Sequence, residues 1–360
     1  MVKEKDVSLP FLDLPIVLAP MGGVATVPLV AAVSNAGGFG ILPCAYLTPD
    51  QIATQTDALR GATTRPFGVN VFVEQPPYVA DDRVLARAHN RLRGYREELG
   101  LPHPDRPAIP PDRYRQQIDA VLAAKPAVFT FTFGIPDAET LARFRDAKIF
   151  TMGTATTVEE ARALKDAGVD GIMAQGYEAG AHRGTFLAPV EESLVGTLAL
   201  VPQVVDATGL PVFASGGIGD GRGVAAVLAL GAAAAAIGTS FLLATESGIA
   251  PAYREALASP DAVRTVFTRA FSGRTARGIP NRVIADLRDP ADIAPYPFQN
   301  AMTRDIRTAA AEQGRAEFLS LWAGQAAPLA TAKPAAEIVA DLMREARESI
   351  ARVVIGHTSV

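Results

Sequence analysis

Cysteine and histidine are scarce in this sequence, whose 360 residues include one Cys and four His. A single Cys cannot form a disulfide within the chain, and such scarcity is typical of a reducing, cytoplasmic setting. None of the His residues has a second His three or four positions away, and no acidic cluster follows an apolar run. The sequence therefore predicts no metal site.

An excess of basic charge is also missing, because 34 Lys and Arg stand against 38 Asp and Glu, for a net charge of −4. No DNA or RNA partner is therefore expected. The first residues lack the apolar stretch of a signal peptide, since charged residues 3–6 come before any apolar run. Residues 223–245 carry no charge, but they are rich in Ala and contain Gly231 and Gly238. This pattern favours a helix followed by a buried strand over a membrane span.

What the chain does contain is a regular alternation of apolar runs and amphipathic stretches, with 49% hydrophobic and 20% charged residues. This composition excludes intrinsic disorder. The predicted strands are 16–21, 39–43, 67–73, 127–133, 148–153, 171–175, 212–215 and 233–237. The predicted helices are 27–35, 49–59 with Thr48 as its cap, 113–124, 137–145, 158–167, 198–208 and 222–230.

Strands that alternate with helices in this way predict an α/β fold, and most economically a closed (β/α)8 TIM barrel. A doubly wound open sheet is the alternative. Such a sheet usually carries an early G-x-G-x-x-G, and none follows the first strand here.

Two segments do not fit the alternation. Residues 74–111 are rich in Pro and Arg and interrupt the third strand–helix unit at the end where barrels bind ligands. This insertion either covers the site or is a surface insertion without a role in the site, and the sequence pattern does not distinguish these two interpretations. Helical patterns such as 335–354 continue to the end. We therefore expect a barrel over residues 1–247 and a smaller, mainly helical domain over 248–360.

Glycines and amides dominate the positions just after the predicted strands, where a barrel binds its ligands. Gly216-Gly217 follow the seventh strand and Gly238-Thr239 follow the eighth. Glycines let backbone N–H groups approach an anion, and a helix N-terminus adds partial positive charge. Two such pairs on consecutive strands favour a phosphate site over simple tight turns.

His182 is the strongest candidate for a catalytic residue, because it lies in a Gly-rich loop, 176–184, directly after the sixth strand. An imidazole there suits either a general base or a group that holds an anionic substrate. Cys44 lies in an apolar stretch, which favours packing over nucleophilic catalysis. Without a metal or an acid–base pair, the harder chemistry must come from a cofactor. A phosphate-bearing cofactor in a barrel lined by amides points to FMN.

Longer motifs recur along the chain. They are APMGG at 19–23, GVNVF at 68–72, QGYEAGAHRG at 175–184, ASGGIGDGRG at 214–223 and GTSFL at 238–242, followed by FSGRTARGIPNR at 271–282, YPFQN at 296–300 and WAGQ at 322–325. In this order and number, they resemble the nitronate monooxygenase family, formerly called 2-nitropropane dioxygenases, in its bacterial class I branch. The resemblance covers nearly the whole chain.

The resemblance implies an FMN-dependent barrel with a smaller domain closing over it. The implied reaction is oxidation of a small alkyl nitronate, such as propionate 3-nitronate, or of a nitroalkane by O₂, with nitrite and an aldehyde or ketone as products. A homodimer is expected. His182 falls on the family's active-site histidine. The implied FMN contacts are Met21, Gly22, Asn70, Gln175, Gly180, Gly216, Gly217, Ala236, Ile237, Gly238 and Thr239.

Several positions depart from the family pattern. Ala181 stands where Gly is common, and Thr132 stands where relatives carry a His. At 236–237, Ala-Ile replace a Gln and a bulkier residue. The Thr132 departure puts the substrate pocket in doubt more than the cofactor site. The candidates for that pocket are Thr132, Tyr296 and Gln299, with packing of the helical domain as the alternative for the last two.

Two other functions stay open. One is an NAD(P)H-dependent FMN reductase of the same barrel superfamily, with a quinone or an enoyl thioester as acceptor. The other is a barrel that binds a phosphorylated ligand without redox chemistry. Bleaching of the flavin by NADH would favour the first, and a colourless protein that ignores FMN would favour the second.

Overall fold

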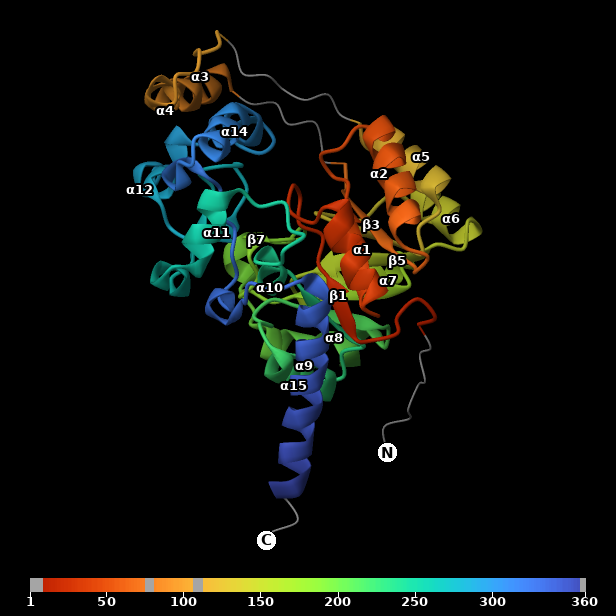
Figure 1. The fold of residues 1–360 in the computed structure, drawn as a ribbon. Helices are drawn as coiled ribbons and strands as arrows, with labels where there is room; N and C mark the ends of the chain where they lie inside the picture. The colour runs from red at the N-terminus through yellow and green to blue at the C-terminus, as the bar shows by residue number, and fades with distance from the viewer. Residues whose placement is uncertain (1–8, 75–80, 106–112, 357–360) are drawn as a thin grey trace.

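The computed structural model describes residues 9–74, 81–105 and 113–356 (Figure 1). Its centre is a closed barrel of parallel strands, which confirms the predicted (β/α)8 fold. In barrel order the strands are β1 (Ile16–Leu18), β2 (Phe39–Pro43), β3 (Gly68–Phe72), β4 (Val128–Thr132), β5 (Phe150–Ala155), β6 (Gly171–Gln175), β8 (Val212–Ser215) and β9 (Ala234–Ile237). The doubly wound alternative is excluded because β1 pairs with β9, which leaves no open edge.

Helices cover the outside of the barrel (Figure 1). They are α1 (Val27–Asn35), α2 (Pro49–Ala62), α5 (Tyr114–Ala124), α6 (Ala138–Asp146), α7 (Val158–Asp166), α8 (Thr197–Thr208) and α9 (Gly221–Ala229). Local signals set where they begin. The Thr48 hydroxyl accepts a hydrogen bond from the Gln51 N–H while the Gln51 side chain accepts one from the Thr48 N–H, a capping box that confirms the predicted cap of α2.

The helix that completes this outer layer comes from the end of the chain. α15 (Ala335–Gly356) packs against both α9 and α1, in the place of the eighth barrel helix. The contact with α9 is close, since a Cβ on Gly221 would lie 2.3 Å from the Cβ of Glu345. Residues 335–356 thus add to the barrel layer, and the division of the chain at residue 247 stays a prediction.

The uncharged segment 223–245 folds as most of α9, the buried strand β9 and the short helix α10 (Thr239–Leu242). Within the part of the chain that the structure describes, no helix combines the length and the apolar character needed to cross a membrane.

Side chains alternate between the inside and the outside of the barrel along each strand. Apolar side chains such as Val17, Phe39 and Phe213 fill the inside near the start of the strands. Near the strand ends the inward positions become polar, as with Asn70 and Gln175, which line a cavity. The barrel is therefore packed at one end and hollow at the end where the site was predicted.

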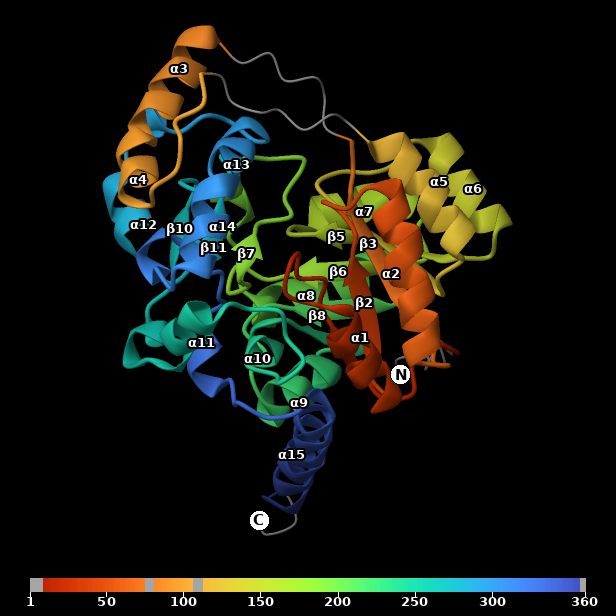
Figure 2. The same cartoon turned by 45° about the horizontal axis from the view of Figure 1, so that its top comes forward.

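A second core joins the insertion to the C-terminal helices (Figure 2). From the insertion come α3 (Asp82–Arg91) and α4 (Arg93–Glu98), and from the C-terminal part come α11 (Pro251–Ala258), α12 (Arg282–Asp286), α13 (Phe298–Met302) and α14 (Arg304–Glu312). Arg96 is fully buried between them and forms an ion pair with Asp305 at 2.8 Å. Neither α3 nor α4 lines the cavities described below. Residues 75–80 and 106–112 of the insertion region lie outside the described residues.

A small antiparallel sheet connects the barrel to this second core. Its strands, in order, are β10 (Val266–Thr268), β11 (Ala276–Gly278) and β7 (Ala181–His182). His182 pairs with Ala276 across this sheet. The loop that follows β6 is therefore held by residues far along the chain.

Candidate active site

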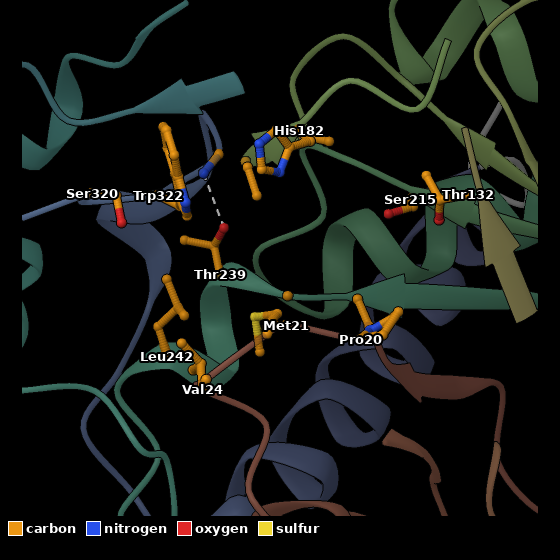
Figure 3. A pocket seen from close by; sticks show the side chains of 18 of the residues that line it. Pro20, Met21, Val24, Thr132, His182, Ser215, Thr239, Leu242, Ser320 and Trp322 are labelled. Carbon is orange, nitrogen blue, oxygen red and sulfur yellow. Dashed lines mark hydrogen bonds between the residues drawn. The ribbon is translucent and has the colours of Figure 1, made fainter. Parts of the chain in front are cut away.

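A cavity of about 370 Å³ lies at the C-terminal end of the barrel, between the strand ends and the second core (Figure 3). Strand ends supply most of its polar groups, and Leu242, Tyr253 and Trp322 supply part of an apolar wall. The predicted site residues that line the cavity are Met21, Gly22, Asn70, Thr132, Gln175, Gly180, His182, Gly216, Gly217, Ala236, Gly238 and Thr239.

Three predicted residues lie elsewhere. Ile237 comes directly after an inward-facing position, so its side chain points the other way, into the core under the helices. Gln299 is fully buried; its amide donates to the Ala270 carbonyl at 2.7 Å and accepts from the Ala294 N–H at 3.0 Å. These bonds hold the chain around α13 and face no cavity. Tyr296 lines a neighbouring outer cavity instead.

The side chain of Gln175 is committed to the loop that carries His182. Its Nε2 donates to the carbonyl oxygen of His182 at 3.0 Å, and its Oε1 accepts from the Gly184 N–H at 2.8 Å. Arg183 is fully buried and donates to backbone carbonyl groups on both sides of this loop. Burial lowers the pKa of Arg183 to about 10, so the guanidinium keeps its charge at neutral pH. Both side chains fix His182 relative to β6.

Backbone conformation around this loop favours small residues. Ala181 has a φ of 59°, which lies in the left-handed region that Gly adopts more readily. Gly is also the residue that the family pattern predicts at this position. A Cβ on Gly180 would lie 2.6 Å from the backbone nitrogen of Gly324. Gly324 in turn donates its N–H to the Thr239 hydroxyl at 3.0 Å (Figure 3). The loop can therefore approach the end of β9 (Ala234–Ile237) this closely only with glycine at position 180.

Gly216 and Gly217 form the part of the cavity that best suits a phosphate. Their φ angles are 104° and 72°, so consecutive residues adopt conformations that favour glycine. Within the described chain, neither N–H group donates a hydrogen bond. Unpartnered N–H groups at a cavity wall attract the oxygens of an anion. These residues, with the Thr239 hydroxyl on the wall of the same cavity, are therefore suited to bind an anionic group such as a phosphate.

We expect Gly216→Ala to weaken FMN binding by about 10- to 100-fold, because backbone strain of this kind costs roughly 1–3 kcal/mol. A Cβ there would lie 3.0 Å from the Ala179 nitrogen and the Gly176 oxygen, so the cradle must shift. Fluorescence titration of the apoprotein with FMN measures the effect. Gly209→Ala is the matched control, since Gly209 has a φ of 63° but a Cβ there meets no atom within 4 Å. Equal FMN affinity in the two variants would show that Gly216 does not contribute to the binding of the phosphate.

His182 reaches the cavity from β7, with its Nε2 2.8 Å from the Ser272 hydroxyl oxygen. That hydroxyl also lies 3.0 Å from the carbonyl oxygen of Arg274, which can only accept a hydrogen bond. The hydroxyl proton therefore belongs to the bond with Arg274, and Ser272 Oγ accepts the Nε2–H of His182. This network assigns the neutral tautomer that carries its proton on Nε2 and leaves Nδ1 bare.

The surroundings of His182 keep it neutral. Burial lowers the pKa of His182 to about 3, with further contributions from the positive charges of Arg274 and Arg307. The rings of Phe133 and Trp322 lie with their centroids 5.9 and 5.7 Å from the imidazole. A neutral imidazole with a bare nitrogen can accept a proton. It cannot serve as a charged anchor, so the geometry favours the first of the two roles that the sequence left open.

Other titratable groups do not offer a competing centre. Cys44 is fully buried, and burial raises the pKa of its thiol to about 12, which leaves it protonated. Among the described residues there is no group of three or more His, Cys, Asp or Glu side chains that could hold a metal ion.

A larger outer cavity of about 1290 Å³ adjoins the first one. Tyr46, Phe72, Phe133 and Asn300 line both cavities. The charged residues of the outer wall are Glu74, Arg113, Glu191, Arg269, Arg274 and Arg304. Positive charge therefore prevails over negative charge among the described residues of this approach to the active cavity.

Sequence patterns do not single out Ser272, Arg274, Arg307 and Trp322, although all four line one of the cavities. For three of them a signal exists, because Ser272 and Arg274 belong to the FSGR motif and Trp322 begins the WAGQ motif. Arg307 lies in α14, outside every motif, and an Arg in an amphipathic helix carries no signal of its own.

The chain is similar over most of its length to known proteins. A family model described as nitronate monooxygenase matches residues 7–345. A Staphylococcus aureus (strain JH9) protein named "Probable nitronate monooxygenase" is 42% identical over 337 residues, which are 93% of this chain and 94% of the relative. The solved structure of nitroalkane oxidase from Streptomyces ansochromogenes matches with a TM-score of 0.89 and 42% identity, over 96% of this chain and 99% of that one. FabK from Thermotoga maritima matches with a TM-score of 0.75 and 28% identity, over 95% of each chain.

Proposed function

We propose that this chain, which belongs to the nitronate monooxygenase family, uses FMN and O₂ to oxidise alkyl nitronates such as propionate 3-nitronate, and nitroalkanes that it first deprotonates to nitronates, releasing nitrite and an aldehyde or ketone. The observation that carries the proposal is the neutral His182, with a bare Nδ1, in a cavity whose wall includes a phosphate cradle. Family membership makes the protein an oxidoreductase. The geometry supplies a base and the groups that would hold the cofactor.

The residues present fit FMN. Gly216, Gly217 and Thr239 would hold the phosphate, and the strand ends at Met21 and Asn70 would face the ring system. The Asn70 Nδ2 donates to the Thr130 hydroxyl at 2.9 Å, which leaves the amide oxygen to accept from a ring N–H. When bound, FMN supplies the electron-accepting chemistry that the described cavity side chains lack.

His182 acts on the proton of a nitroalkane substrate. The C–H bond next to the nitro group breaks, its electron pair moves into the nitro group to give the nitronate, and the proton goes to Nδ1. Ser272 keeps the opposite nitrogen protonated and so holds the active tautomer. Phe133 and Trp322 restrict water near the imidazole. The charges of Arg274 and Arg307 stabilise the anion that forms.

The proposed activity predicts nitrite release together with O₂ uptake when FMN-saturated protein receives propionate 3-nitronate without NADH. The reason is that the nitronate itself provides the electrons. An oxygen electrode and a colorimetric nitrite assay measure both quantities, and free FMN at the same concentration is the control for the uncatalysed reaction. A protein that keeps its FMN but releases no nitrite above this control does not have the proposed function.

An NAD(P)H-dependent FMN reductase is the second candidate, with a quinone or enoyl thioester as acceptor. The outer cavity favours it, because about 1290 Å³ leaves room for a second large ligand beside the active cavity. Rapid bleaching of the flavin by NADH without O₂ distinguishes this activity from nitronate oxidation. A cytoplasmic location and a homodimeric assembly stay predictions.

A further inference from the structure

We propose that Glu178 is a positioning residue for the FMN phosphate. Its carboxylate holds the glycine pair, Gly216 and Gly217, in the shape that binds the phosphate, and it does so without contacting the ligand. Glu178 lies in the loop that carries His182 and is not among the described residues that line either cavity. The inference rests on the proposed function, because that function includes FMN.

The Glu178 carboxylate caps a helix that lacks a cap of its own. α8 begins at Thr197, and the residue before it, Gly196, has no side chain to accept a hydrogen bond from the first N–H groups. The Thr197 N–H instead donates to both carboxylate oxygens of Glu178, each at 3.0 Å. The positive end of the helix dipole further stabilises the carboxylate. A residue 19 positions earlier in the chain thus fixes the start of α8.

Thr197 connects this cap to the glycine pair. Its hydroxyl lies 3.0 Å from a carboxylate oxygen of Glu178 and 2.8 Å from the carbonyl oxygen of Gly216. Both oxygens are acceptors, so they share the single hydroxyl proton. In a trans peptide the C=O and the following N–H point in opposite directions. The bond to Thr197 therefore turns the Gly217 N–H away from α8, and within the described chain that N–H donates to no other group.

The side chain of Glu178 is enclosed by three glycines. A Cβ on Gly217 would lie 3.2 Å from the Glu178 Cβ, and one on Gly196 would lie 3.2 Å from the Glu178 Oε1. A Cβ on Gly176 would lie 2.6 Å from the other carboxylate oxygen. The carboxylate can therefore reach α8 and pack against the glycine pair only because these positions lack side chains.

The backbone of Glu178 reaches the other half of the phosphate site. Its carbonyl oxygen accepts from the Gln325 N–H at 2.9 Å. The adjacent Gly324 donates its N–H to the Thr239 hydroxyl at 3.0 Å. A substitution of Glu178 keeps this carbonyl, so it should disturb the glycine pair and leave the Thr239 half in place.

Nearby cations balance the charge of Glu178. Burial lowers the pKa of Arg183 and that of Arg277, and the charge of Glu178 acts against this effect in both. With two guanidinium groups and the α8 dipole close by, the carboxylate acts on the glycine pair through its hydrogen bonds and not through its charge. Glu178→Gln separates the two contributions, because an amide keeps an acceptor and loses the charge.

A comparison of FMN with riboflavin tests the inference, because riboflavin has the same ring system and no phosphate. Fluorescence titration of the full chain freed of flavin gives both dissociation constants. We expect Glu178→Ala to raise Kd for FMN by about 10- to 100-fold, the loss of hydrogen bonds to a charged group, and Kd for riboflavin by less than about threefold. Equal increases for the two ligands would indicate a general effect on the fold and would overturn the proposal.

Two further variants make the result specific. Thr197→Val keeps the N–H that caps onto Glu178 and the size of the side chain, but it removes the hydroxyl bond to Gly216. It should raise Kd for FMN selectively, even if Glu178→Ala does not fold. Glu178→Gln should restore FMN binding, because its amide oxygen accepts from the Thr197 N–H and its amide nitrogen donates to the hydroxyl. FMN binding as weak as in Glu178→Ala would contradict a role through hydrogen bonds.

Glu192→Ala is the matched control, since it removes an exposed carboxylate from η1 (Val190–Ser193), just before α8. Its ratio of the two dissociation constants should equal that of the wild type. A fall as large as in Glu178→Ala would show that any negative charge near α8 has this effect, and Glu178 would then have no special role.

Nitronate turnover plays no part in these titrations, which separates this proposal from the proposed function. If the variants show the expected pattern but the protein releases no nitrite from propionate 3-nitronate, the function fails and the role of Glu178 stands. If nitrite is released and Glu178→Ala keeps the wild-type ratio, the role of Glu178 fails alone. A wild-type protein that binds riboflavin as tightly as FMN would overturn both the phosphate cradle and this role.

Discussion

Replacing His182 by alanine is expected to lower kcat/KM for a nitroalkane by about 10²- to 10⁴-fold, the usual contribution of a positioned general base, while FMN stays bound. The loss follows because the bare Nδ1 is the proton acceptor of the cavity. The cofactor should stay because Gln175 and Ala276 bond the backbone of residue 182, which alanine keeps. Stopped-flow reduction of the flavin without O₂ measures the step, and the visible spectrum reports FMN content.

The same variant should lose much less activity with a ready-formed nitronate, since that substrate has already given up its proton. His103→Ala is the control, because His103 lies in the insertion and lines neither cavity. Equal losses on nitroalkane and nitronate would show that His182 does not act as a base. Unchanged kcat/KM on the nitroalkane would remove His182 from the mechanism.

The depressed pKa also sets the pH dependence. An imidazole of ordinary pKa would lose its basic form below about pH 6.5, but His182 keeps it down to about pH 3. The rate of flavin reduction by a nitroalkane should therefore show no fall through pH 6.5 from this group. Because the folded protein holds the pKa below its unfolded value, unfolding takes up a proton between these two pH values. The contribution of His182 to stability is therefore present above the unfolded pKa and is lost as pH falls toward 3.

Replacing Glu160 by alanine is expected to lower the free energy of unfolding by about 3–5 kcal/mol, the cost of breaking a buried charged network. The Glu160 side chain is fully buried. Its Oε2 accepts from the N–H and the hydroxyl of Thr156, both at 2.7 Å, and its Oε1 accepts from the Thr185 hydroxyl and the N–H groups of Phe186 and Leu187. Alanine would leave these donors buried without an acceptor.

Urea unfolding of the apoprotein measures this loss, and Glu159→Ala provides the control on the same helix, with an exposed carboxylate. The segment 185–187 that Glu160 holds also receives the hydrogen bond of Arg274. KM for the nitronate should therefore rise in Glu160→Ala under conditions where the protein still folds. A stability equal to that of Glu159→Ala would show that water or other side chains satisfy the freed donors.

Local patterns predict the barrel well, because eight apolar runs bounded by glycines leave little choice of architecture. Their ends are less certain. The first strand stops at Leu18 in place of Met21, since the chain leaves the sheet there to form the cavity wall. The fifth begins at Phe150 in place of Lys148, because Lys148 has a φ of 55° and belongs to the preceding turn.

The residues that set the protonation state of His182 are harder to predict from the sequence. Ser272 meets His182 across 90 positions of sequence. Their meeting depends on the pairing of β7 with β11, two strands of 2 and 3 residues that carry no periodic signal. The orientation of Ile237, in contrast, follows from strand alternation once one inward position on β9 is known. The motif predicts a pocket role for Gln299, but its buried amide bonds two backbone groups instead, because buried polar groups need hydrogen-bond partners.

The use of α15 as the eighth barrel helix has a consequence for synthesis on the ribosome. The strand β9 is complete at Ile237, but the helix that packs against α9 and α1 begins only at Ala335. At a translation rate of ~5–20 residues per second, about 5–20 s separate the two events. During that interval, the apolar faces of α1 and α9 that α15 covers stay exposed on the nascent chain. A chaperone that binds apolar segments should therefore associate with this protein late in its synthesis.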